Sequence, residues 1–211
     1  MSMNIETEIK FRLQNFERIE NIYASLSDSF ILYPYDKSML YDIYYDTENF
    51  DLLKSGYSYR VRNKRNRSLN FKTKGEVIYG LLSRIEYRDE IDYGIQNDSV
   101  LNFNCQTNAI ARKIFPSVLQ KKITLCSYRT SFILYYKSAN DVKKFGVCSF
   151  DQFFEKNIKK KYYEVEIESC DERLSSDLFN SFMTIKSKFD FLGIPNITSN
   201  KYSTLMKDIG I

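Results

Sequence analysis

The segment Asn4–Leu13, NIETEIKFRL, places charged and apolar side chains on opposite faces of a strand. Side chains two residues apart point to the same side of a strand, so one face must meet a polar environment and the other an apolar one. A single strand of this kind is typical of a protein surface, and the pattern constrains the fold only if it recurs. The charged face carries Glu6, Glu8, Lys10 and Arg12, and the other carries Ile5, Thr7, Ile9, Phe11 and Leu13.

The same division does recur along the chain. Four further segments show it, at residues 57–64, 69–75, 81–91 and 162–169. Their charged faces carry, in order, Arg60, Arg62 and Lys64, then Lys72 and Lys74, then Arg84, Glu86 and Arg88, then Glu164, Glu166 and Glu168. Aromatic and β-branched residues predict three more strands, which are 39–46, 122–136 with Arg129, and 144–154 with Asp151. The sequence therefore predicts eight strands, most of them with one charged face.

Three segments with helical spacing lie between or after these strands. Residues 16–26 carry apolar side chains at helical intervals and follow Asn15, a residue type that caps helix N-termini. Residues 97–118 and 172–192 show two more apolar stripes, and residues 196–211 are expected to form a tail. Each stripe must be covered by apolar surface from elsewhere in the chain.

An ordinary barrel or sandwich would bury the apolar strand faces and leave little apolar sheet for the helices to cover. The opposite arrangement satisfies both sets of residues, with apolar faces outward beneath the helices and charged faces lining a hydrated tunnel. Long runs of one sign, such as three glutamates on one strand beside two arginines on another, would also be costly unless mobile ions or ligand charges lay between them. We therefore predict an α+β fold: an eight-stranded antiparallel β-barrel with a charged interior and about three flanking helices, formed by a single domain over residues 1–211.

The composition excludes several classes of function. The formal net charge is only +4, too low for a protein that coats nucleic acid or binds membranes through a polybasic segment. No segment has the length and hydropathy of a membrane span or a signal peptide, so we expect a cytoplasmic protein with no membrane partner. The four cysteines form no C-x2-C pair and histidine is absent, which predicts reduced, buried cysteines and no zinc site. Carboxylates must hold any metal, which favours Mg²⁺ or Mn²⁺.

Five motifs follow one another along the chain. They are E-x-E-x-K at Glu6, Glu8 and Lys10, the stretch YYDTENFDLLKSGYSYRVR, the lysines of FKTKG, R-x-E at Arg84 and Glu86, and the late EVEIE. In this order and spacing they resemble the CYTH family of triphosphate tunnel metalloenzymes. An E-x-E-x-K motif alone is common by chance, whereas the set of five spans the chain and is specific. The family fold is an eight-stranded antiparallel tunnel, so the resemblance implies the fold inferred above.

The resemblance implies metal-dependent hydrolysis of a triphosphate inside the tunnel. A triphosphate carries about four negative charges, which guanidinium and ammonium groups on several strands can bind along its length. Glu86 is one candidate for the group that accepts the proton of the attacking water, and Lys10 is a candidate catalytic cation. The expected substrate ligands are Lys10, Arg60, Arg62, Lys72, Lys74, Arg84, Arg129 and Lys201. The expected ligands of Mg²⁺ or Mn²⁺ are Glu6, Glu8, Glu166 and Glu168, supported by Asp151 and Glu164.

The chain departs from the family pattern at three positions. Arg88 stands where the family commonly has a second acidic residue after the R-x-E glutamate, and Ser127 stands where a lysine is common. Asn200 interrupts the Ser-Lys element that ends at Lys201. These differences concern the details of substrate binding rather than the fold.

Four functions remain open from the sequence. The first is a triphosphatase acting on inorganic tripolyphosphate or another small triphosphate. The second is an RNA 5′-triphosphatase with triphosphate-ended RNA as partner, which the late YEVEIE stretch favours and the R-V-R and K-T-K patterns disfavour. The others are a class IV adenylyl cyclase, in which a ribose hydroxyl attacks instead of water, and a non-catalytic polyphosphate or nucleotide binder. The oligomeric state is left open.

Overall fold

The computed structural model describes residues 2–15, 18–64, 66–91, 104–137, 142–155, 157, 160–171 and 175–211. Within these residues the chain forms ten strands and five helices. The strands are β1 (Ser2–Leu13), β2 (Phe30–Asp46), β3 (Ser58–Asn63), β4 (Arg67–Lys72), β5 (Glu76–Ile78), β6 (Leu81–Ile91), β7 (Gln120–Lys137), β8 (Val142–Glu155), β9 (Tyr162–Ser169) and β10 (Asn196–Ile197). The helices are α1 (Ile19–Ser27), α2 (Asp51–Lys54), α3 (Gln106–Ile114), α4 (Ser176–Phe191) and α5 (Lys201–Asp208).

Eight of these strands close into an antiparallel barrel, as predicted. Their order is β1, β9, β8, β7, β2, β3, β4 and β6, and β6 pairs again with β1. Closure depends on β1. Its first half pairs with β6, where Glu6 lies opposite Arg84. Its second half pairs with β9, where Lys10 lies opposite Glu166. The short strands β5 and β10, which the sequence analysis did not predict, extend β6 and β1.

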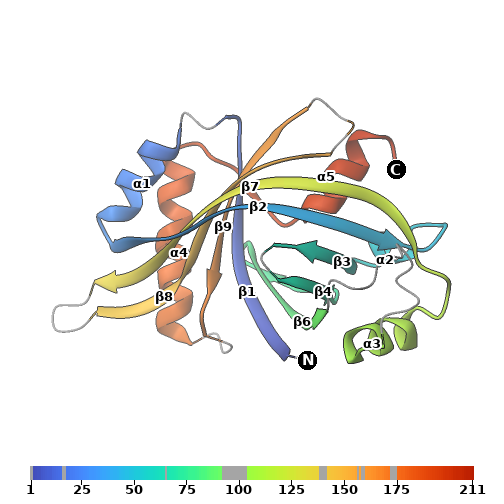
Figure 1. Cartoon of the computed structure of the whole chain (residues 1–211). Coiled ribbons are helices and arrows are strands. Elements are labelled where there is room, and N and C mark those ends of the chain that lie inside the picture. Colours follow the sequence, from blue (N-terminus) through green and yellow to red (C-terminus); the bar gives the residue numbers. More distant parts are fainter. Residues whose placement is uncertain are drawn as a thin grey trace.

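The barrel is apolar outside and charged inside. On one flank α1 and α4 pack against the outward faces of β1, β8 and β9, and Phe11 stacks on Phe189 with ring centroids 3.8 Å apart. On the other flank α3 covers β3 and β4, where Tyr59 and Phe71 are buried with Ala111. Figure 1 shows α1 and α4 together on one side of the barrel and α3 on the other. The helices and strands therefore bury each other's apolar faces and leave the charged faces inside.

The C-terminal helix α5 fills one end of the tunnel with apolar side chains. The ring of Tyr202 stacks on that of Tyr44, with centroids 5.0 Å apart, and its hydroxyl donates to Asp46 at 3.2 Å. This segment was expected to be a tail, although Asn200 caps the helix by accepting a hydrogen bond from the Ser203 amide at 2.7 Å. The buried cluster at this end contains Tyr44, Ile123, Leu125, Phe153, Tyr162, Tyr202, Leu205 and Met206.

Some boundaries differ from the predicted ones. The helix α1 begins at Ile19 with Arg18 at the N-cap position, so Asn15 is not its cap. β2 begins at Phe30, well before the predicted 39–46, because its first half pairs with β7 beneath α1. The predicted helices 97–118 and 172–192 appear as α3 and α4, and residues 97–103 and 172–174 lie outside the described residues.

None of the four cysteines forms a disulfide, and they are not all buried. Cys126 and Cys148 are buried, Cys105 is half-buried, and Cys170 is exposed because it follows the last residue of β9. The expectation of four buried cysteines is therefore wrong for Cys105 and Cys170.

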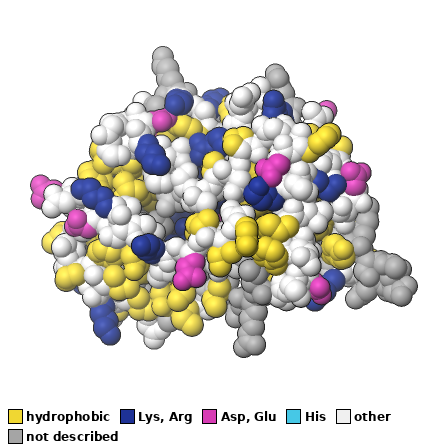
Figure 2. All heavy atoms as spheres, turned by 180° about the vertical axis from the view of Figure 1, so that it is seen from behind, with side chains coloured by type: hydrophobic (Ala, Val, Ile, Leu, Met, Phe, Trp, Pro, Cys, Tyr) yellow, Lys and Arg dark blue, Asp and Glu magenta, His cyan; other side chains and the backbone are white. Residues whose placement is uncertain are grey.

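On the face shown in Figure 2, basic and acidic side chains are scattered among apolar and neutral ones, with no large block of either sign. No helix within the described ranges is both long and apolar enough to cross a membrane. The dense groups of charge in the described structure lie in the barrel.

Candidate functional site

Seven cations on five strands and one helix converge on a narrow cavity in the barrel. Its volume is about 30 Å³, so the side chains around it fill most of the tunnel cross-section. Seven of the eight predicted substrate ligands are thus brought together. They are Lys10 of β1, Arg60 and Arg62 of β3, Lys72 of β4, Arg84 of β6, Arg129 of β7 and Lys201 of α5, and Tyr44, Ser58, Glu166 and Asn200 complete the lining.

Lys74, the eighth predicted ligand, is exposed and does not line this cavity. The prediction placed it beside Lys72 by strand alternation, but β4 ends at Lys72. Beyond that point the Thr73 amide donates to the Ile85 carbonyl at 3.0 Å, and the chain turns toward β5. Alternation therefore does not extend to Lys74, and the structure does not bring it to the other cations.

Asp42 on β2 holds both arginines of β3. Arg62 donates from Nε and Nη2 to the two oxygens of Asp42, both at 2.7 Å, and Arg60 Nη1 lies 3.4 Å from Oδ2. Burial would raise the pKa of Asp42, but Arg62 and Arg60 lower it well below its usual value. Asp42 is therefore a fixed anion that orients two guanidinium groups at the cavity wall.

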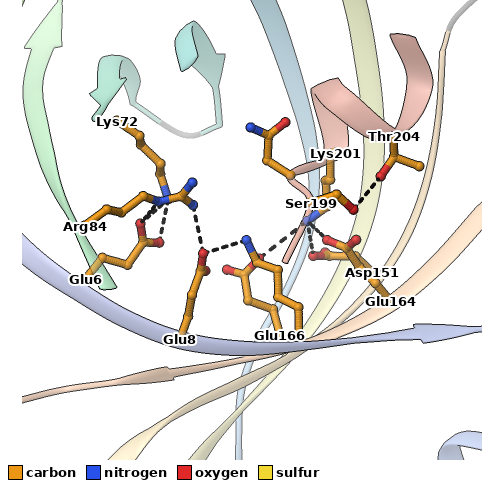
Figure 3. A network of polar contacts seen from close by, with 12 residues as sticks. Glu6, Glu8, Lys72, Arg84, Asp151, Glu164, Glu166, Ser199, Lys201 and Thr204 are labelled. Atoms are coloured by element: carbon orange, nitrogen blue, oxygen red, sulfur yellow. Dashed lines mark hydrogen bonds and ion pairs between the residues drawn. The ribbon is translucent and has the colours of Figure 1, made fainter. Parts of the chain in front are cut away.

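Glu6 and Glu8 of β1 are bound by cations from neighbouring strands (Figure 3). Lys72 donates to both oxygens of Glu6, at 2.5 and 2.7 Å. Arg84 bridges the two glutamates, with Nε 3.1 Å from Glu6 and Nη2 2.8 Å from Glu8. Lys10 donates to Oε1 of Glu8 at 2.6 Å, while Oε2 of Glu8 is buried without a hydrogen bond from the described residues.

A second group of charges lies nearer α5. Arg129 donates from Nε and Nη2 to the two oxygens of Asp151, at 2.8 and 2.6 Å. The ammonium nitrogen of Lys201 lies 3.0 Å from Asp151 Oδ2 and 3.6 Å from Glu166 Oε2, and it also pairs with Glu164. Figure 3 shows Lys201 pointing from α5 into this group of carboxylates.

The carboxylates of the tunnel differ in pKa according to their neighbours. Burial would raise the pKa of Glu6 and of Glu166, but Lys72 and Arg84 lower the first, and Lys10, Lys201 and Arg129 lower the second. Burial and the Glu6 carboxylate raise the pKa of Glu8. Burial and nearby carboxylates, first among them Glu6, raise the pKa of Glu168 to about 8. The cations of the protein therefore leave negative charge uncompensated around Glu168.

The described residues contain two groups of three carboxylates. In each group, one oxygen from each residue lies within 4.8 Å of the oxygens from the other two. Oxygen-only donor sets of this kind fit Mg²⁺ or Mn²⁺. The first group fits better, because Glu168 has no ion pair within the described residues. Glu8, predicted as a ligand, belongs to neither group because its Oε1 faces Lys10 and Arg84. The groups are Glu6, Glu166 and Glu168, and Asp151, Glu164 and Glu166.

Wider cavities lie at the end of the tunnel away from α5. One, of about 490 Å³, is lined by Glu6, Glu86, Arg129 and Glu168 among others. Glu86 accepts a hydrogen bond there from the Asn70 amide at 3.1 Å and lies 3.9 Å from Arg60 and 3.8 Å from Lys72. A second cavity, of about 350 Å³, shares Arg129 and includes Arg62 and Arg88. We call this end, with both cavities, the tunnel mouth.

Sequence reasoning missed four residues of the site: Asp42, Tyr44, Ser58 and Asn200. Asp42 and Tyr44 share strand parity within the aromatic stretch 39–46, so the alternation that revealed the other charged faces could have found them. Ser58 shares parity with Arg60 in the same way. Asn200 could have been found as the N-cap of a short helix.

A family comparison agrees with this geometry. The model of the CYTH domain family matches residues 4–194. Among curated proteins, no sequence matches this chain significantly.

Solved structures share the fold at low sequence identity. A candidate adenylate cyclase from Bacillus halodurans is 18% identical, with a TM-score of 0.63 over 95% of this chain and 97% of that one. A candidate adenylyl cyclase from Hippeastrum, described as having a dominant triphosphatase activity, is 18% identical, with a TM-score of 0.62 over 96% of both chains. A protein from Pyrococcus horikoshii is 15% identical, with a TM-score of 0.57 over 96% of this chain and 99% of that one.

Proposed function

Because this chain belongs to the CYTH family, we propose that it is a metal-dependent triphosphatase that hydrolyses the terminal phosphate of tripolyphosphate or another small triphosphate. One observation carries the proposal: seven cations and an incompletely neutralised group of three carboxylates share one tunnel. The cations alone would suffice to bind a polyanion. The carboxylates would repel it unless a divalent cation joined them, so the combination supports binding of both.

Phosphate oxygens would take over cations that now pair with carboxylates. The central cavity is small, and Lys72 and Arg84 are held by Glu6. A triphosphate with about four charges competes with Glu6 for these two cations. Glu6 then gains negative charge beside the phosphate, which favours recruitment of a divalent cation. We therefore expect metal and triphosphate to bind cooperatively, each raising the affinity for the other.

Glu6, Glu166 and Glu168 would hold the Mg²⁺ or Mn²⁺ ion. Such an ion would supply positive charge to stabilise the charge that develops on the transferred group. The residues of the chain bind and orient the substrate: Arg60 and Arg62, fixed by Asp42, lie along one wall. Lys10 of β1 also lines the cavity with its ammonium. Burial would lower the pKa of Lys10, but Glu8 and Glu166 raise it, so the ammonium stays charged.

Glu86 would accept the proton of the attacking water. Its carboxylate lines the mouth cavity, its side chain is 17% exposed, and the hydrogen bond from Asn70 fixes its orientation. A base in this position has solvent on one side and the cations of the tunnel on the other. In-line attack on a terminal phosphorus requires a water molecule between the two. A Glu86→Gln variant should lower kcat much more than it changes KM.

A second candidate function is a cyclase, because two neighbouring structures are described as candidate adenylyl cyclases. The Hippeastrum neighbour, with its dominant triphosphatase activity, favours hydrolysis. The mouth cavities leave room for a nucleoside attached to the triphosphate, so substrate size alone does not separate the two reactions.

The test measures products from tripolyphosphate, ATP, thiamine triphosphate and triphosphate-ended RNA, with Mg²⁺, with Mn²⁺ and with EDTA. The wild type should release orthophosphate only with metal, and Glu166→Gln should lose this activity. Pyrophosphate and cyclic nucleotide from ATP would replace the proposal with a cyclase. Triphosphate binding without any product would make the chain a binder.

A further inference from the structure

Lys201 lies at the centre of the second acidic group rather than beside it. Its ammonium contacts Asp151, Glu164 and Glu166, the three residues whose oxygens lie within 4.8 Å of one another. Glu164 Oε1 pairs with Lys201, and Glu164 Oε2 lies 3.8 Å from Arg12. A protein cation therefore occupies the position that a divalent ion would need.

The fold holds Lys201 in this position. It is the first residue of α5, and the helix is anchored immediately after it by Tyr202, which stacks on Tyr44. Arg12 also ties β1 to the helix by donating to the Thr204 hydroxyl at 2.9 Å. The Lys201 side chain is 7% exposed, so its ammonium is held among the carboxylates with little access to bulk solvent.

Charge balance separates the two acidic groups. In the second, Lys201 is joined by Arg129, which donates twice to Asp151, and by Arg12, which lies 3.8 Å from Glu164. Burial would lower the pKa of Lys201, but Asp151, Glu164 and Glu166 raise it, so the ammonium keeps its proton. In the first group Glu168 lacks such a partner within the described residues and borders the tunnel mouth.

We propose that Lys201 is a built-in cation of the second acidic group, so that the tunnel binds one divalent ion, at Glu6, Glu166 and Glu168, rather than two. This inference rests on the metal dependence of the proposed function. It assigns Lys201 to the carboxylates, whereas the sequence had suggested a triphosphate contact. It also makes the docking of α5 a condition for excluding a second ion.

The test counts Mn²⁺ ions bound per chain, from the loss of the free-ion electron paramagnetic resonance signal in metal-stripped full-length protein without substrate. The wild type and Lys201→Arg should bind one ion, because both keep a cation in the second group. Lys201→Met should bind two, because it removes the ammonium that contacts all three buried carboxylates. Lys207→Met, which changes an exposed lysine of the same helix, should bind one.

Two ions in the wild type, or one in a folded Lys201→Met variant, would overturn the inference. If Lys201→Met does not fold, two other variants decide the question. Glu164→Gln should keep the single ion, and Glu168→Gln should lose it. Loss of the ion in Glu164→Gln would overturn the inference. A wild type that binds no Mn²⁺ contradicts the proposed metal dependence instead. Gain of one ion by Lys201→Met would then still support the assignment of Lys201.

Discussion

Asp42 and Arg62 form a two-point ion pair across the β2–β3 ladder, with the Nε–Oδ1 and Nη2–Oδ2 distances both 2.7 Å. The carboxylate also lies 3.4 Å from Arg60, so one buried anion sets the direction of two cations. Because the pair lies in the barrel wall, these guanidinium groups are oriented before any substrate binds, which reduces the ordering that binding requires.

Replacing Asp42 by Asn should therefore weaken both stability and substrate binding. Loss of one partner of a buried ion pair typically costs about 3–5 kcal/mol, and the partial exposure of both arginines places this site at the low end of that range. Urea unfolding should show this loss. Tripolyphosphate should raise the Tm of Asp42→Asn less than that of the wild type, because the two guanidinium groups are no longer oriented for phosphate and the substrate binds more weakly. An equal shift in both proteins would contradict the role given to Asp42.

Lys72 and Lys74 form a matched pair for testing which cations bind substrate. Lys72 lines the central cavity and Lys74 is exposed beyond the end of β4. Loss of a charge-assisted contact to phosphate should reduce kcat/KM by about 10²-fold in Lys72→Ala. Lys74→Ala should stay within about twofold of the wild type. Similar losses in the two variants would show that Lys74 reaches the substrate after all.

The contrast between these lysines shows how far alternation predicts the site. The period of two identified the charged faces of β1, β3, β4, β6 and β9, although it was not applied to β2, which carries Asp42. Closure of the barrel then required those faces to meet inside. The prediction failed at Lys74 because β4 ends at Lys72 and the chain turns toward β5. Parity shows that a side chain points inward, but it does not show where a strand stops.

The metal ligands show a second limit. Glu6, Glu8, Glu166 and Glu168 were equivalent in the sequence, yet Glu8 is held by Lys10 and Arg84 while Glu168 remains available. This difference follows from the stagger between β1 and its neighbours, which brings Arg84 of β6 to both glutamates of β1. Stagger is a property of the closed barrel, so the pattern of a single strand does not contain it.

The raised pKa of Glu168 predicts how the stability of the metal-free protein depends on pH. Burial and nearby carboxylates raise this pKa from an ordinary 4.5 to about 8, so between these values the folded chain holds a proton that the unfolded chain has lost. The free energy of unfolding should therefore fall as pH rises through this window, by about 2–4 kcal/mol. Urea unfolding in EDTA at pH 5.5, 7.0 and 8.5 measures this slope.

Glu168→Gln should flatten that slope, because the amide does not titrate. Glu90→Gln removes an exposed carboxylate of β6 and should keep the slope of the wild type. Saturating Mn²⁺ should restore stability at pH 8.5 in the wild type but not in Glu168→Gln, because binding to the ionised carboxylate stabilises the folded state. An unchanged slope in Glu168→Gln would assign the pH dependence to another group.

The outward apolar face of the barrel can be tested on α4. Phe182 is fully buried against the barrel, whereas Phe191 is 90% exposed at the end of the same helix. Phe182→Ala should lower the free energy of unfolding by about 3–5 kcal/mol, because it leaves a cavity between helix and sheet. Phe191→Ala should change it by less than about 0.5 kcal/mol. Equal effects would contradict the packing of α4 on the barrel.

The central claim is that one tunnel binds a triphosphate through its cations and a divalent ion through Glu6, Glu166 and Glu168. Anomalous diffraction at the manganese edge, from crystals grown with Mn²⁺ and a non-hydrolysable imidotriphosphate, tests both parts at once. We predict a manganese peak among these three glutamates, with the phosphates beside Arg60, Lys72 and Arg84. Manganese bound elsewhere, or the triphosphate outside the barrel, would contradict the account.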